Sequence, residues 1–151
     1  MTRDEFYEKN EKIKKGNYES IFAYRWDCRS LGLKALEDCD LLKDCLETFD
    51  GVLRNEEAPK DVKNEICYSL GEFASVYMGK DSSYSETVRQ NASRMISGVV
   101  KNHAYTFEEF VQNYTTPDSD ILKNLVDEMK VRSEAKKNSP QHQQVVPQRF
   151  I

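Results

Sequence analysis

The chain has 151 residues with 26 acidic and 22 basic side chains, a formal net charge of −4 at pH 7 and an isoelectric point near 5.3. This acidic balance argues against a nucleic-acid-binding protein, because phosphate binding needs a basic stripe. Residues 1–15 are charged throughout, unlike a signal peptide, and no apolar run exceeds the four residues 21–24, whereas a membrane span needs about 20. We therefore expect a soluble, cytoplasmic protein without membrane contact.

The first two predicted helices lie within residues 1 to about 31. Thr2 and Glu5 have the spacing of a capping box, which predicts the start of a helix that ends at Gly16. A second helix follows Asn17, and its apolar residues spread around much of its circumference, which predicts a central position. We expect these side chains of the second helix to point inward: Tyr18, Ile21, Phe22, Arg25, Trp26 and Cys28.

The next two predicted helices follow a break at Gly32. From residue 33 to about 54, apolar residues recur every three or four positions, which places them on one helical face. The polar residues 55–59 form a loop. A fourth helix begins near Lys60 and ends at Gly79, which we expect in the left-handed conformation.

Three further helices are predicted after residue 80. Asp81 or Ser82 caps the first of them, and Thr106 with Glu109 forms a capping box at the start of the second. The last helix opens at residues 116–118 and frays near residue 137.

The fold predicted from these patterns is all-α, because no segment alternates apolar and polar residues over the length of a strand. We expect a compact bundle of six to seven helices, with a short HEAT-like stack of helical hairpins as the alternative. Residues 1–137 form one helical domain. Residues 138–151, which contain two prolines and four glutamines, form a flexible polar tail whose apolar pairs could dock as an extended peptide.

Residue types that carry chemistry are scattered along the chain. The cysteines at 28, 39, 45 and 67 each lie in a helical pattern, which favours buried thiols over disulfides or metal ligands. Glycines occur singly, so no phosphate-binding loop is present. His103, at a predicted helix end, and His142 lack the glutamate three positions earlier that di-iron bundles carry. We therefore predict no catalytic, cofactor-binding or metal-binding residue.

One acidic cluster stands out in the predicted third helix. Six acidic residues and one cation, Lys43, lie between Glu37 and Asp50. Four of the acids follow a spacing of three and four, which places them on one face opposite the apolar stripe. This predicted partner-binding face consists of Glu37, Asp40, Asp44 and Glu47. The alternative is an ordinary solvated face of an acidic protein.

The sequence is compatible with three classes of function. The first is a non-catalytic protein-binding module, specifically an inhibitor or immunity-type protein that masks a basic partner, such as a nucleic-acid-cleaving toxin, through the acidic face. The second is a structural or oligomeric adaptor subunit, for which an aromatic residue of the second helix remains outside as a contact. The third is an enzyme whose site combines scattered acidic residues with some of the 8 tyrosines.

Overall fold

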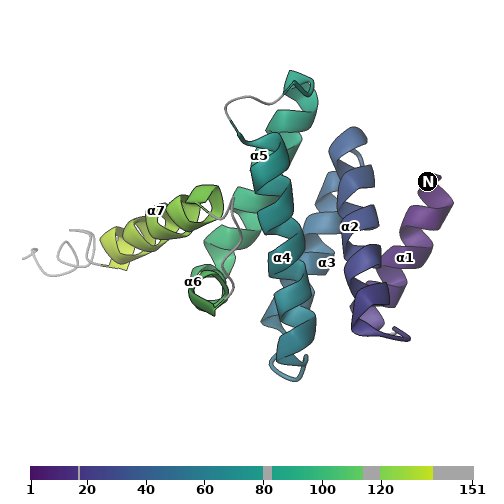
Figure 1. Ribbon diagram of the computed structural model, residues 1–151, viewed down its shortest axis with the longest axis horizontal. Coiled ribbons are helices and arrows are strands. Elements are labelled where there is room, and N and C mark those ends of the chain that lie inside the picture. The colour runs from purple at the N-terminus through teal and green to yellow at the C-terminus, as the bar shows by residue number, and fades with distance from the viewer. Residues whose placement is uncertain (17, 80–82, 114–119, 138–151) are drawn as a thin grey trace, which may run out of the picture.

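A computed structural model describes the chain except residues 17, 80–82, 114–119 and 138–151 (Figure 1). The described residues contain seven α-helices and no strand, which confirms the all-α prediction. The helices are α1 (Arg3–Lys15), α2 (Ile21–Glu37), α3 (Leu42–Arg54), α4 (Lys60–Tyr77), α5 (Glu86–Asn102), α6 (Ala104–Asn113) and α7 (Asp120–Lys137). The predicted tail lies outside the described residues, and the assignment of residues 1–137 to one domain stays a prediction.

The helices pack as a compact bundle in which the chain alternates between two layers (Figure 1). α1, α3 and α5 contact one another in series, and α2 lies beside α4 in the other layer. α6 packs against α7, and α7 packs against α4 and α5. The first five helices therefore have the alternation of a helical-hairpin stack, and α7 extends from the side of α4 that faces away from α2 (Figure 1).

The ends of α1 match the prediction. The Thr2 hydroxyl accepts a hydrogen bond from the Glu5 backbone N–H at 3.1 Å, and the Glu5 carboxylate accepts one from the Thr2 backbone N–H at 3.0 Å. Gly16 ends the helix at φ 68°, in the left-handed region that favours glycine. The capping box and the glycine stop are both confirmed.

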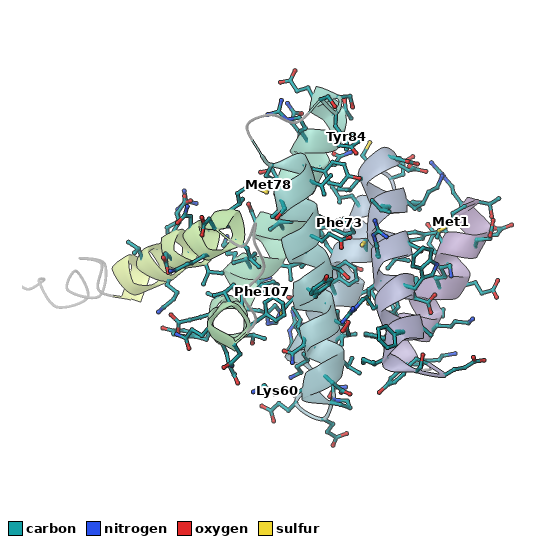
Figure 2. All side chains as sticks on the ribbon, viewed as in Figure 1. Met1, Lys60, Phe73, Met78, Tyr84 and Phe107 are labelled. Carbon is teal, nitrogen blue, oxygen red and sulfur yellow. The ribbon has the colours of Figure 1, made fainter. Side chains whose placement is uncertain are left out.

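The predicted break at Gly32 is wrong, because α2 continues from residue 21 to residue 37. Its N-cap is Ser20, whose hydroxyl accepts from the Ala23 N–H at 3.2 Å; the predicted cap, Asn17, lies outside the described residues. Gly32 instead lies against the side chain of Phe73, which is on the side of α4 that faces α2 (Figure 2).

The single helix predicted over residues 33–54 is also wrong, since residues 38–41 form a turn between α2 and α3. Arg3 fixes this turn from a distance: its guanidinium donates to Asp38 at 2.8 and 3.0 Å and to Asp40 at 3.1 Å. Leu41 is fully buried within the turn. The spacing of apolar residues by three and four therefore continues across residues 38–41, although the helix is interrupted there.

Later boundaries differ from prediction in three places. Gly79 is not left-handed, because Gly16 alone among the described residues has a positive φ. α5 begins after Ser85, whose hydroxyl accepts from the Val88 N–H at 3.3 Å, while residues 81, 82 and 116–118 lie outside the described part of the chain. Thr106 lies inside α6 rather than at its start, because α6 follows the α5 C-cap, His103, directly.

Every helix contributes buried side chains to the core. Three of the four cysteines are buried, as predicted, whereas Cys39 is exposed in the turn after α2. The inward orientation predicted for Tyr18, Phe22 and Trp26 is wrong: they are 37%, 71% and 62% exposed. Tyr24 and Cys28 of α2 face the core instead, so α2 has a buried face and an aromatic outer face.

Candidate functional site

The four acidic residues of the predicted partner-binding face do not share one helical face. Glu37 is the last residue of α2, Asp40 lies in the following turn, and Asp44 and Glu47 lie on α3. Glu37 and Glu47 are exposed. Asp40 pairs with Arg3 at 3.1 Å, and Asp44 accepts a hydrogen bond from the Tyr7 hydroxyl at 3.2 Å. Two of the four carboxylates therefore already have partners on α1.

Arg3 also pairs with Asp38, at 2.8 Å. Its hydrogen bonds hold the pKa of the Asp38 carboxyl below its ordinary value, despite the opposing effect of burial. The acidic segment is thus an attachment point for α1 as well as an exposed surface. Its role in binding a partner stays a prediction.

A second surface, formed by α2 and α4, was not predicted. Phe22 and Trp26 lie four residues apart and therefore on the same outer face of α2. Beside them lies a row of α4 side chains spaced by three and four residues. We define the α2/α4 patch as Phe22, Arg25, Trp26 and Arg29 of α2 together with Glu65, Tyr68, Ser69 and Glu72 of α4.

Arg25 joins the two helices of the patch. Its Nε lies 2.6 Å from Oε2 of Glu65 and its Nη2 lies 2.7 Å from Oε1, a bidentate pair. The Glu65 side chain is only 7% exposed. The guanidinium also lies over two rings, 4.5 Å from the centroid of Tyr68 and 5.5 Å from that of Phe22. The position of Arg25 is therefore fixed by an ion pair and by cation–π contacts.

A second arginine repeats this arrangement one turn later. Nε of Arg29 lies 2.7 Å from Oε1 of Glu72, and its guanidinium lies 5.9 Å from the centroid of the Trp26 ring. Both cations of the patch therefore come from α2, and both carboxylates come from α4.

A small pocket of about 260 Å³ lies in the α2/α4 patch. Ser69, which is 1% exposed, lines it. The Ser69 hydroxyl has no hydrogen-bond partner, although serine within a helix commonly bonds to the carbonyl four residues earlier. A buried hydroxyl without a partner costs roughly 1–3 kcal/mol, so a ligand group that reaches this one would recover part of that cost.

A larger groove, of about 570 Å³, lies where the end of α1 meets α3 and the loop before α4. Glu47 of the predicted acidic face lines it, together with Lys14, Lys15 and Glu57. Charges of both signs line this groove, so it does not extend the acidic surface.

Among the described residues, no group of three or more His, Cys, Asp and Glu side chains could hold a metal ion. No helix in this part of the chain is long and apolar enough to cross a membrane.

Sequence reasoning missed the α2/α4 patch because it treated α2 as a central helix. The spacing Phe22-x-x-Arg25-Trp26-x-x-Arg29 is visible in the chain. It was a usable signal, because a helix with two arginines on its aromatic side cannot bury that side without partners for both charges. The pairing with α4 is visible only in the fold.

Comparison of the chain with protein-family models, with curated protein sequences and with solved structures finds no match.

Proposed function

We propose that this chain is a non-catalytic protein-binding module whose partner docks on the α2/α4 patch. The observation that carries the proposal is the exposure of Phe22 and Trp26 side by side on α2, each beside an arginine. Trp, Tyr and Arg are the residues most enriched at the centres of protein interfaces. Single apolar residues on a surface are ordinary, whereas exposed apolar side chains that lie together favour an interaction site.

The patch is also rigid, which favours binding. The two Arg–Glu pairs hold the arginine side chains in place before a partner arrives. Ordering a flexible side chain costs about 0.5–1.5 kcal/mol on association, and a side chain that is already fixed avoids most of that cost. An exposed aromatic ring that becomes buried then supplies the favourable free energy.

The acidic residues support a different version of the same function. A basic partner, as in the inhibitor hypothesis, would meet the exposed carboxylates of Glu37 and Glu47. We place the main contact on the α2/α4 patch, because exposed charges contribute chiefly to the rate of encounter, whereas burial of aromatic rings supplies affinity.

The experiment is affinity capture from a lysate of the source organism with four forms of the chain. They are the wild type, Phe22→Ala, Trp26→Ala and the control Val131→Ala. Val131 is 64% exposed on α7, which extends from the side of α4 opposite α2 (Figure 1). Untagged copies of the chain itself are included in the mixture. All four forms are first compared by thermal unfolding, to show that each variant is folded. Substitutions of exposed side chains typically change the free energy of unfolding by about 0.5 kcal/mol or less.

We expect a protein that the wild type and Val131→Ala retain and that both α2 variants lose. Retention that is equal in all four forms would contradict the proposal, and so would the absence of any stoichiometric partner.

A further inference from the structure

The α2/α4 patch carries opposite charges on its two helices, and this arrangement is complementary to itself. The arginines at 25 and 29 lie on α2, and the glutamates at 65 and 72 lie on α4. We infer that the patch binds a second copy of this chain, related to the first by a two-fold axis along the groove between α2 and α4. This inference rests on the proposed function, because it names the partner of the same patch.

The direction of the axis follows from the ion pairs. Arg25 pairs with Glu65, and further along both helices Arg29 pairs with Glu72, so α2 and α4 run in the same direction (Figure 1). A two-fold axis parallel to them, in the plane between the copies, places α2 of each copy over α4 of the other. The guanidinium of Arg29 in each copy then faces the carboxylate of Glu72 in the other, while Glu65, only 7% exposed, stays paired with Arg25 of its own copy. An axis across the groove would instead place α2 of one copy over α2 of the other, so that arginines face arginines. Like charges that face each other in an interface cost on the order of several kcal/mol.

The pocket adds a second complementary pair. A rotation about an axis along the groove leaves the position of every side chain along the groove unchanged. Trp26 and Ser69 line the same pocket, so Trp26 of each copy comes to lie over the pocket of the other. The indole N–H of a buried tryptophan requires an acceptor, and the Ser69 hydroxyl lacks a partner. Contact between the copies satisfies both groups.

The size of the pocket favours a side chain over a small molecule. Its volume of about 260 Å³ is below the range of roughly 300–1,000 Å³ that is typical of small-molecule sites. Each partner contributes about 20–30 residues to a standard interface, and the patch has fewer. We therefore expect a weak dimer, with a dissociation constant of about 0.1 mM.

Trp26 is the only tryptophan of the chain, so its fluorescence reports directly on the patch. The purified full-length chain is examined by sedimentation equilibrium and by tryptophan emission from about 1 µM to about 1 mM. We expect the average mass to rise towards that of a dimer, with a parallel shift of the emission to shorter wavelength. Val131→Ala should behave as the wild type does.

Charge exchange between α2 and α4 tests the arrangement. In Arg29→Glu both helices carry glutamate at this level of the patch, and in Glu72→Arg both carry arginine. Each variant alone should remain monomeric at concentrations at which the wild type associates. An equimolar mixture should form a heterodimer, because every contact then pairs opposite charges, and the double variant with both changes should dimerise again. A mixture that stays monomeric would show that the inference is wrong.

Ser69→Ala provides a test that does not alter charge. Removal of a buried hydroxyl without a partner should leave the stability of the monomer unchanged or slightly higher. Dimerisation should weaken about 25-fold, because the two-fold axis places the contact in the dimer twice and each lost hydrogen bond weakens association about fivefold. Unchanged dimerisation in Ser69→Ala would refute the Trp26–Ser69 contact. A wild type that stays monomeric to about 1 mM with constant emission would refute the dimer. The proposed function would then still stand if Trp26→Ala abolished capture of a different protein.

Discussion

The backbone of Gly32 lies directly against the ring of Phe73. A Cβ atom at Gly32 would lie 2.3 Å from Cε2 and 2.7 Å from Cζ of that ring, closer than any real Cβ contact. Because Phe73 is 1% exposed and held on all sides, the ring cannot move without disturbing the core. This contact fixes the distance between α2 and α4, and therefore the width of the patch that they form.

Gly32→Ala should destabilise the protein. The added methyl group forces α2 and α4 apart or moves the ring of Phe73, and overpacking of this kind typically costs about 1–3 kcal/mol. Chemical unfolding monitored by circular dichroism measures the change. Gly51→Ala is the matched control, because a Cβ at Gly51 in α3 meets nothing within 4 Å. Alanine there should stabilise the protein by about 0.5–1 kcal/mol. Equal effects at the two glycines would contradict the role of Gly32.

These two glycines show what local sequence reasoning can reach. Helical periodicity identified nearly every helix, because burial of one face is a property of a short window. A glycine reads as a break in such a window whether it ends a helix, as Gly16 does, or admits a neighbouring ring, as Gly32 does. Phe73 lies 41 positions further along the chain, so the ring that explains Gly32 is outside any local pattern.

The cysteines should differ sharply in reactivity. Burial raises the pKa of the thiols of Cys28, Cys45 and Cys67, and the thiolate is the form that reacts. Cys39 is exposed. A thiol-specific reagent should therefore modify one cysteine per native chain rapidly and all 4 after unfolding in denaturant. Cys39→Ser should abolish the rapid phase. Rapid modification of a second cysteine in the native chain would contradict this assignment.

The Arg25–Glu65 pair should show the asymmetry of a buried ion pair. Arg25→Met leaves the carboxylate of Glu65, which is 7% exposed, without its guanidinium partner. We expect a loss of about 2–4 kcal/mol of stability. The double variant Arg25→Met with Glu65→Leu removes both charges and should lie within about 1 kcal/mol of the wild type. Unfolding by urea measures both, and a double variant as unstable as the single one would show that loss of the guanidinium–ring contacts, rather than of the ion pair, causes the destabilisation.

The candidate site was harder to predict than the fold, because its contacts join residues that lie far apart in the sequence. The Arg25–Glu65 pair spans 40 positions and the Arg3–Asp38 pair spans 35, so neither has a local signal. The first joins the outer side of α2 to α4. The second ends α2 and separates Glu37 from Asp44, two residues whose spacing alone predicts a shared face.

Asp50 should make stability depend on pH in the acid range. Burial alone would raise its pKa, but hydrogen bonds from His103 and Asn102, together with the charges of His103 and Arg54, outweigh burial and lower the pKa below its ordinary value of 3.8. His103 Nε2 lies 2.7 Å from Asp50 Oδ1. A carboxyl whose pKa is lower in the folded state stabilises that state above its unfolded pKa, and this contribution is lost as the pH falls through the folded pKa.

The wild type should therefore be more stable than Asp50→Asn near pH 5, and the difference should close as the pH falls below about 4. Thermal unfolding across this range measures it. Asp127→Asn, at an exposed position of α7, makes the same chemical change and should show a much smaller difference. A wild-type advantage that grows towards low pH would contradict the role of Asp50.

The acidic residues and the α2/α4 patch lead to opposite predictions for the same binding assay. If the patch carries the main contact, the double reversal Glu37→Lys with Glu47→Lys should weaken binding of the captured partner or of a second copy less than about threefold at 0.15 M salt, because exposed charges are screened there. Trp26→Ala should weaken it more than about tenfold. These two glutamates are the clean positions for reversal, since Asp40 and Asp44 also hold α1 through Arg3 and Tyr7. Loss of binding on reversal, together with release of the partner at about 0.5 M salt, would instead establish a basic partner on the acidic surface.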